Sequence, residues 1–176
     1  NGNALVATAL LDSTTLVTGF AAPALYPAVV GASGAAGDLN GDGFPDLVVP
    51  AYTLPDIAVF LGNGDGSFGT ASTYPTGHSS YSAVIGDLNG DGVPDLAVTN
   101  AGDATISILI GTGSGTFLPH TVVAAGPAGS TPYSIVNEDF NGAGIPDLSH
   151  GVELQDGTNA VRVLRGNCNG TFRKHL

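Results

Sequence analysis

The chain has 176 residues, of which 43% are hydrophobic and 11% are charged. This composition is typical of a globular protein and excludes a disordered segment, which carries more charge and fewer apolar residues. Lys and Arg total 4 against 15 Asp and Glu, and the net charge of −11 argues against a nucleic-acid partner.

The first predicted element is a strand at Ala4–Leu11, followed by a polar turn at Asp12–Ser13. The strand is shorter than the ~20 apolar residues of a membrane-spanning helix, and no basic residue precedes it, so neither a span nor a retained signal peptide is predicted. The next segment, Phe20–Tyr26, matches Phe68–Tyr74 further along the chain. Residues 1–26 are therefore expected to form the back half of a unit that recurs later in complete form.

Three near-copies of one sequence follow, at residues 37–46, 86–95 and 138–147. The first copy reads Gly-Asp-Leu-Asn-Gly-Asp-Gly-Phe-Pro-Asp, and its first Asp recurs at Asp87 and Asp139. A period of about 50 residues belongs to stacked supersecondary units. Oxygen-bearing side chains at alternate positions, separated by glycines, let a tight loop curl around a hard cation. The repeat therefore predicts three related loops of which calcium is the natural ligand.

The same order of strands follows each loop. A short apolar or β-branched run comes first, at residues 47–49, 96–98 and, more weakly, 148–150. After a polar gap, residues alternate in polarity over 57–61, 106–110 and 161–165, and a period of two residues indicates a strand. Glycine-rich turns that permit positive φ angles then lead into an aromatic residue, at 62–68, 111–117 and 166–172.

A further short strand precedes each loop, as at Tyr81–Ile85 and Tyr133–Val136, so each unit has four strands. Four short antiparallel strands repeated every ~50 residues describe a blade of a β-propeller. The predicted fold class is all-β, with the half-blade at 1–26 and repeats at about 27–76, 77–126 and 127–176. A closed propeller needs at least about four blades, so we expect a partial propeller or one completed by another chain.

These features resemble the FG-GAP/VCBS repeat family, the calcium-binding blades of integrin α-subunit heads and of many bacterial secreted proteins. The resemblance covers roughly residues 20–172 and rests on the Asp-x-Asn-Gly-Asp-Gly-x-Pro-Asp string, the following strand and the glycine turn, in that order. It implies Ca²⁺ as the cofactor, bound by side chains and, at Phe44, Val93 and Ile145, by main-chain carbonyl oxygens. The side chains that it implies are Asp38, Asn40, Asp42 and Asp46, then Asp87, Asn89, Asp91 and Asp95, and finally Asp139, Asn141 and Asp147.

The third loop has Ala143 where the other two have Asp42 and Asp91. Loss of one carboxylate weakens a calcium site, so we expect two strong sites and a third that is weak or vacant. The alternative for all three loops is a solvated turn without metal, because Asn-Gly and Asp-Gly are ordinary turn formers. Loops one and two each carry acids at three matched positions, which is more than a turn needs and favours a calcium site. For loop three, both the calcium site and the solvated turn stay open.

An EF-hand loop begins in the same way but places a bidentate acid at its twelfth position and enters a helix there. Counted from Asp38 and Asp87, that position holds Val49 and Val98, inside predicted strands. The proline before the ninth position also suits a loop that turns into a strand. The sequence therefore favours the propeller blade over the EF-hand.

No catalytic constellation emerges, because no serine lies in a Gly-x-Ser-x-Gly elbow and the four histidines lack metal-ligand spacing. The protein is therefore predicted not to be an enzyme. Cys168 is interpreted as an exposed turn thiol, with intermolecular pairing as the alternative. Asn169 begins the Asn-Gly-Thr pattern of an N-glycosylation acceptor, which matters only if the source glycosylates.

The function expected from these features is a non-enzymatic calcium-binding repeat module, extracellular or at the cell surface, with a role in adhesion or self-assembly. Calcium is abundant outside cells, which suits such loops. An unpaired apolar strand at 4–11 would be an exposed edge, so we expect self-association through N-terminal strands, with a head-to-tail filament as one outcome, or a longer parent chain. The alternative is a carbohydrate-binding propeller or the propeller part of a polysaccharide-active enzyme, although the absence of Trp weakens it.

Overall fold

The computed structural model describes residues 33–174, which form twelve strands in three sheets without a helix. Blade 1 consists of β1 (Ala35–Gly37), β2 (Asp46–Pro50), β3 (Asp56–Phe60) and β4 (Ser72–Pro75). Blade 2 consists of β5 (Ser80–Gly86), β6 (Asp95–Asn100), β7 (Thr105–Leu109) and β8 (Thr121–Ala124). Blade 3 consists of β9 (Thr131–Glu138), β10 (Asp147–Glu153), β11 (Asn159–Gly166) and β12 (Phe172–Lys174). The predicted all-β class with four-stranded blades is confirmed.

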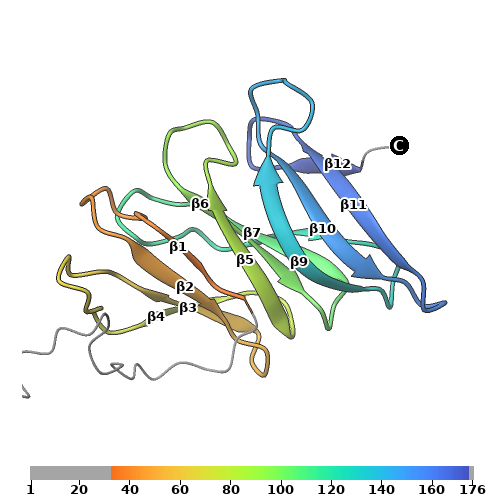
Figure 1. The fold of residues 1–176 in the computed structure, drawn as a ribbon, viewed down its shortest axis with the longest axis horizontal. Coiled ribbons are helices and arrows are strands. Elements are labelled where there is room, and N and C mark those ends of the chain that lie inside the picture. The colour runs from red at the N-terminus through yellow and green to blue at the C-terminus, as the bar shows by residue number, and fades with distance from the viewer. Residues whose placement is uncertain (1–32, 175–176) are drawn as a thin grey trace, which may run out of the picture.

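Each blade is an antiparallel sheet in which strands that follow one another in sequence lie side by side. The three sheets stand next to one another in chain order and do not close into a ring (Figure 1). Within the described residues, no helix has the length and hydropathy needed to span a bilayer. The predicted half-blade at 1–26 lies outside the described residues.

The core lies between the blades. Between blades 1 and 2, Leu39, Val48, Ile57 and Val59 pack against Ala83, Leu96, Val98 and Leu109. Between blades 2 and 3, Leu88, Ala97, Ile106 and Ile108 pack against Ile135, Leu148 and Leu164. Strand alternation explains this arrangement, because successive side chains point to opposite faces of a sheet and blade 2 has a neighbour on each face. Four of the five residues of β7 are therefore buried, and Thr105 is the exception.

Polar contacts along the inner strands join the blades as well. The Thr99 hydroxyl donates to the carbonyl oxygen of Tyr133 at 2.6 Å, and the Asn137 amide donates to the carbonyl oxygen of Ile85 at 3.2 Å. The turn of blade 2 reaches back to the first loop, where Gly115 N–H donates to the carbonyl oxygen of Leu39 at 3.2 Å. These bonds satisfy backbone oxygens that the stacking of sheets removes from water.

The glycine turns adopt the positive φ angles that the sequence predicts. Gly64 and Gly113 have φ of 78° and 80°, and Cys168, which takes their place in blade 3, has φ of 60°. A left-handed conformation costs a non-glycine residue roughly 1 kcal/mol or more. The Cys168 side chain is exposed, as its turn position implies.

His150 is a buried imidazole on the face of β10 that packs toward blade 2, and it is 1% exposed. Its Nε2 donates to the carbonyl oxygen of Ala125 at 2.8 Å, while Nδ1 has no hydrogen-bond partner among the described residues. Burial lowers the pKa of His150 below its usual 6.5, and the charge of Arg162 lowers it further, whereas the bond to Ala125 opposes the shift. His150 is therefore neutral in the folded protein at neutral pH.

A stability effect at mildly acidic pH follows from this burial. Unfolding restores an ordinary pKa, so the unfolded chain binds a proton more readily, and stability falls as pH drops below about 6.5. In the His150→Val variant, which carries the residue found at the equivalent Val98, this part of the pH dependence is expected to disappear. Urea unfolding of the variant and the wild type at pH 7.5 and pH 5.5 measures it. An unchanged pH dependence in His150→Val would contradict the prediction.

Candidate metal-binding loops

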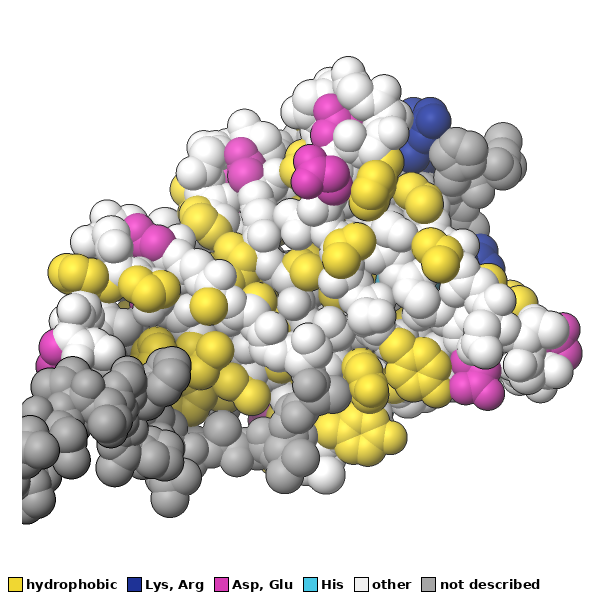
Figure 2. All heavy atoms as spheres, viewed as in Figure 1, with side chains coloured by type: hydrophobic (Ala, Val, Ile, Leu, Met, Phe, Trp, Pro, Cys, Tyr) yellow, Lys and Arg dark blue, Asp and Glu magenta, His cyan; other side chains and the backbone are white. Residues whose placement is uncertain are grey.

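The three repeated loops each join the first strand of a blade to the second. We call residues 38–46, 87–95 and 139–147 loops one, two and three. The backbone pair at the base of each loop is Gly37 with Asp46, Gly86 with Asp95, and Glu138 with Asp147. The loops lie along one edge of the molecule, where acidic side chains appear in the surface view (Figures 1 and 2). The repeat of blades thus places three copies of one loop at one end of the sheets.

The first Asp of each loop curls the backbone around its own carboxylate. Asp38 accepts from Gly41 N–H at 2.7 Å and from Gly43 N–H at 2.8 Å. Asp87 accepts from Gly90 and Gly92 at the same two distances. Positive φ angles of the intervening glycines let these N–H groups turn inward. The N–H of Gly43 is the main cause of the lowered pKa of Asp38, so its carboxylate is readily ionised.

The middle of loops one and two is also the same in detail. Asn40 Nδ2 donates to Asp42 Oδ2 at 2.9 Å, and Phe44 N–H donates to Asp42 Oδ1 at 2.8 Å. In loop two, Asn89 Nδ2 donates to Asp91 Oδ2 at 2.9 Å. These side chains are on the exposed side of the loop. The amide and the carboxylate of each pair are thus held together by a hydrogen bond.

The last Asp of each loop is buried and anchors the loop to the blade. Asp46 accepts from Leu39 N–H and Gly62 N–H, both at 2.8 Å, so one carboxylate joins the loop to the turn after β3. Asp95 makes the equivalent bonds to Leu88 and Gly111. This anchoring role was not predicted from the sequence, which identified the residue only as a calcium ligand. The sequence feature that could have indicated this role is the glycine that opens the turn after β3 and after β7.

Burial raises the pKa of Asp95, and the hydrogen bonds from Gly111 and Leu88 oppose that effect. The negative charges of Asp91 and Asp87 raise the pKa of Asp95 further. Three carboxylates of one loop therefore repel one another within a short distance, and a cation between them would relieve the repulsion.

Loop three differs from the other two because Ala143 cannot accept a hydrogen bond through its side chain. Asn141 Nδ2 instead donates to Asp147 Oδ2 at 2.8 Å, which is the oxygen that receives a backbone N–H in loops one and two. Phe140 N–H is directed to the carbonyl oxygen of Glu138. Asp139 still accepts from Gly144 N–H at 2.7 Å, and this bond is the main cause of its lowered pKa. Loop three thus keeps the bonds of its first Asp and the bond from the following turn to its last Asp, but differs in the contacts of Asn141 and Phe140.

Loops one and two offer calcium an all-oxygen donor set, which is the type that this ion prefers. A carboxylate oxygen that accepts one hydrogen bond keeps a second lone pair for a cation. Among the described residues, however, three or more His, Cys, Asp or Glu side chains do not converge on one point. Phe44, whose carbonyl oxygen is a further predicted ligand, has its exposed ring against Gly64.

Two further features were not predicted. A pocket of about 530 Å³ lies between loops two and three, lined by Asp87, Asn89, Ile145 and Cys168 among others. Tyr52, Tyr81 and Tyr133 form a row of edge-to-face rings, with centroids 6.2 and 5.3 Å apart. Tyr81 and Tyr133 occupy equivalent positions in β5 and β9, a spacing that the sequence itself contained.

The comparisons with known proteins agree with this repeat organisation. A family model described as an FG-GAP-like repeat matches residues 38–98 and 87–149. No curated protein sequence matches the chain. Among solved structures, a lectin of Agrocybe aegerita that recognises non-reducing terminal N-acetylglucosamine superposes with a TM-score of 0.52 and 22% identity.

The match to the lectin covers 78% of this chain but only 36% of the lectin chain, and at this identity it shows the fold alone. The pore of the Photorhabdus luminescens Tc holotoxin also matches, with 20% identity and a TM-score of 0.47, over 79% of this chain and 7% of that chain. The chain therefore spans about a third or less of the length of these structures.

The third loop provides a test of the calcium ligands. Ala143→Asp restores the missing carboxylate and is expected to add one calcium to the stoichiometry measured by titration calorimetry, because loop three would then carry the same three carboxylates as loops one and two. Asp42→Ala is expected to remove one strong site. Ser72→Asp, which adds the same charge on an exposed position of β4, serves as the control. If Ala143→Asp binds no more calcium than the control, the prediction that the missing carboxylate weakens loop three is wrong.

Proposed function

Because the chain belongs to the FG-GAP-like repeat family, we propose that it is a non-enzymatic repeat module that calcium stabilises and that serves adhesion or self-assembly outside the cell. The observation that carries the proposal is the duplicated hydrogen-bond pattern of loops one and two. Each loop brings three carboxylates into nine residues and uses the last one to anchor its blade. A cation bound there would stabilise the junction between loop, blade and following turn.

Calcium would act on folding stability in this proposal. Ordering a loop that contains mutually repelling carboxylates is costly without a counter-ion, so binding and ordering are coupled. Extracellular calcium is concentrated enough to fill loops of moderate affinity, and this supports a location outside the cell or at its surface. The anchors Asp46 and Asp95 are 0% exposed, so the effect of a cation would extend from the loop into the blade.

The described residues contain one pair of a histidine and a carboxylate, and its contacts are consistent with a structural role. His78 Nδ1 lies 3.1 Å from Asp103, and the His78 side chain is 74% exposed. The same carboxylate accepts from His78 N–H at 2.6 Å, so the pair joins the segment before β5 to the turn before β7. The pair is therefore a local tether between these two segments.

Calcium removal tests the proposed function. Excess EDTA is expected to lower the melting temperature, because each occupied site contributes about 2.7 kcal/mol when free calcium is a hundredfold above its dissociation constant. The Asp42→Ala/Asp91→Ala double variant is the matched control, since its melting temperature should respond little to either calcium or EDTA. An unchanged melting curve in EDTA, from a protein shown to be free of metal, would overturn the proposal.

A second candidate function is carbohydrate binding, which the row of tyrosine rings favours. Tyr52 is 49% exposed, and the hydroxyl of Tyr133 donates to Glu153 Oε2 at 2.9 Å. That bond is the main cause of the raised pKa of Tyr133. Exposed aromatic faces beside a carboxylate can stack on sugar rings and accept from their hydroxyls. A glycan array comparing the protein with Tyr52→Ala separates the candidates, because a structural module would give no signal that depends on this tyrosine.

A further inference from the structure

One tyrosine from each blade contributes to the row of rings, and we call Tyr52, Tyr81 and Tyr133 the tyrosine row. Tyr52 follows β2 in blade 1, Tyr81 lies near the start of β5, and Tyr133 lies near the start of β9. Loops two and three follow the other ends of β5 and β9, and loop one precedes β2 (Figure 1). The tyrosine row therefore lies at the strand ends opposite the metal-binding loops.

The same backbone irregularity presents two of these rings. The pairing of β5 with β6 skips Tyr81, and the pairing of β9 with β10 skips Tyr133 and Ser134. Bulges of this kind re-aim a side chain and are common next to functional sites. Two blades thus repeat a device that turns a tyrosine out of the regular strand pattern.

A buried threonine fixes the backbone at both bulges. Thr99 is 0% exposed, and its hydroxyl oxygen accepts from Ser82 N–H at 3.1 Å and donates to the carbonyl oxygen of Tyr133 at 2.6 Å. One side chain is therefore bonded both to the residue after Tyr81 and to Tyr133 itself. Rings held in place in this way lose little freedom when a ligand binds, which lowers the cost of binding.

The rings stand nearly at right angles to their neighbours, at 76° between Tyr52 and Tyr81 and 78° between Tyr81 and Tyr133. The row therefore presents ring faces in more than one direction. Glu153 adds a carboxylate that accepts from the Tyr133 hydroxyl at 2.9 Å. This bond is the main cause of the raised pKa of Tyr133, and the phenol groups of Tyr81 and Tyr52 raise it further, so both lie within electrostatic reach of Tyr133.

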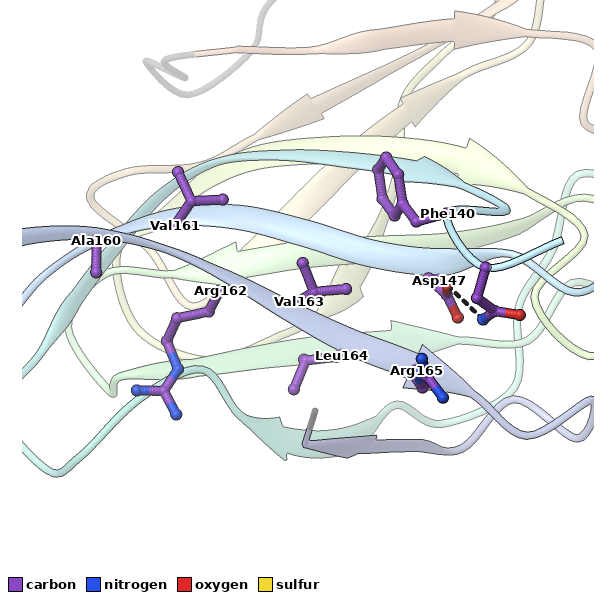
Figure 3. A pocket seen from close by; sticks show the side chains of 9 residues that line it. Phe140, Asp147, Ala160, Val161, Arg162, Val163, Leu164 and Arg165 are labelled. Carbon is purple, nitrogen blue, oxygen red and sulfur yellow. Dashed lines mark hydrogen bonds between the residues drawn. The ribbon is translucent and has the colours of Figure 1, made fainter. Parts of the chain in front are cut away.

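The Glu153 carboxylate forms no salt bridge with a Lys, Arg or His among the described residues. The arginines of the adjacent strand β11, Arg162 and Arg165, line a pocket beside Val161 instead (Figure 3). The chain as a whole has a net charge of −11. A ligand that approaches the tyrosine row therefore meets an unneutralised carboxylate in a negative field, which attracts a cation and repels an anion.

We propose that the tyrosine row and the carboxylate beside it bind a methylated ammonium cation, such as the trimethylammonium group of choline. Rings at right angles can contact a rounded cation from more than one side, and the carboxylate balances its charge. A primary ammonium is more strongly hydrated and would lose more on leaving water. A neutral sugar ring stacks on one flat ring face, so the angles between these rings favour the cation. The inference goes beyond the calcium-stabilised module and does not depend on it.

Titration calorimetry of the full chain, in calcium and at constant ionic strength, tests the proposal with choline as the probe. Saturable binding in roughly the millimolar range is expected. Two controls separate charge from shape: a neutral analogue with a tert-butyl group in place of the trimethylammonium group, and ethanolamine, which lacks the methyl groups. Both are expected to bind about tenfold more weakly than choline. Phosphocholine and trimethyllysine, titrated in parallel, distinguish a choline headgroup from a protein side chain as the source of the cation.

Tyr52→Leu removes the most exposed ring of the row and is expected to weaken choline binding roughly fivefold, whereas Tyr52→Phe keeps a ring and should bind as the wild type. Phe140→Leu is the matched control, since Phe140 is 51% exposed against 49% for Tyr52 and lies in loop three. Glu153→Gln is expected to weaken binding most strongly at low ionic strength, where the charge contact is least screened.

Melting curves of all variants verify folding, and the EDTA experiment measures calcium stabilisation separately, so this proposal and the proposed function can fail independently. Absence of saturable choline binding overturns the proposal, as does equal affinity for choline and its neutral analogue. Wild-type affinity in Tyr52→Leu also overturns it. Saturable binding of a neutral sugar without binding of choline would overturn it in favour of carbohydrate as the ligand of the tyrosine row.

Discussion

Each four-stranded blade has two apolar faces, and only contact with neighbouring blades removes both of them from water. Blade 2 meets this condition, since its third strand is buried between blades 1 and 3. A single small sheet is not stable alone, because burial of a hydrophobic face is its main source of stability. The loops, turns and inter-blade hydrogen bonds all depend on this stacking, which sets where each loop lies relative to the next turn.

The buried aspartates connect that stacking to the proposed calcium chemistry. Asp46 and Asp95 are ionisable groups inside the protein, and each receives two backbone N–H donors that stabilise its charge. The outer acids of the same loops, Asp42 and Asp91, face solvent. A cation bound to the exposed side of a loop would therefore stabilise a carboxylate that holds the blade together. In the proposed function, the structural repeat and the ion site would thus be parts of one arrangement.

Differences between the repeats are as informative as their similarities. Blade 3 carries Ala143 in place of an aspartate, Cys168 in place of a turn glycine, His150 in place of a core valine, and every Lys and Arg of the chain. Val161 and Phe140 are exposed, whereas the equivalent Ile106 and Leu88 of blade 2 are buried. These changes lie in different parts of blade 3: His150 is on its face toward blade 2, whereas Ala143 and Cys168 are in its loop and turn.

The sequence by itself determined the blade, because period-two strands and glycines at fixed spacing specify local conformation. Ile57–Leu61 and Ile106–Ile110 were predicted as strands, and Gly64 and Gly113 as turn glycines, from residues close together in the chain. Only the tertiary structure decided which face of a strand is covered. Val161 and Ile106 have the same local pattern, yet one is exposed and the other buried, since burial depends on whether another blade is present. The double hydrogen bond of Asp46 was likewise decided by the fold, because one of its donors, Gly62, is brought to it by the pairing of β2 with β3.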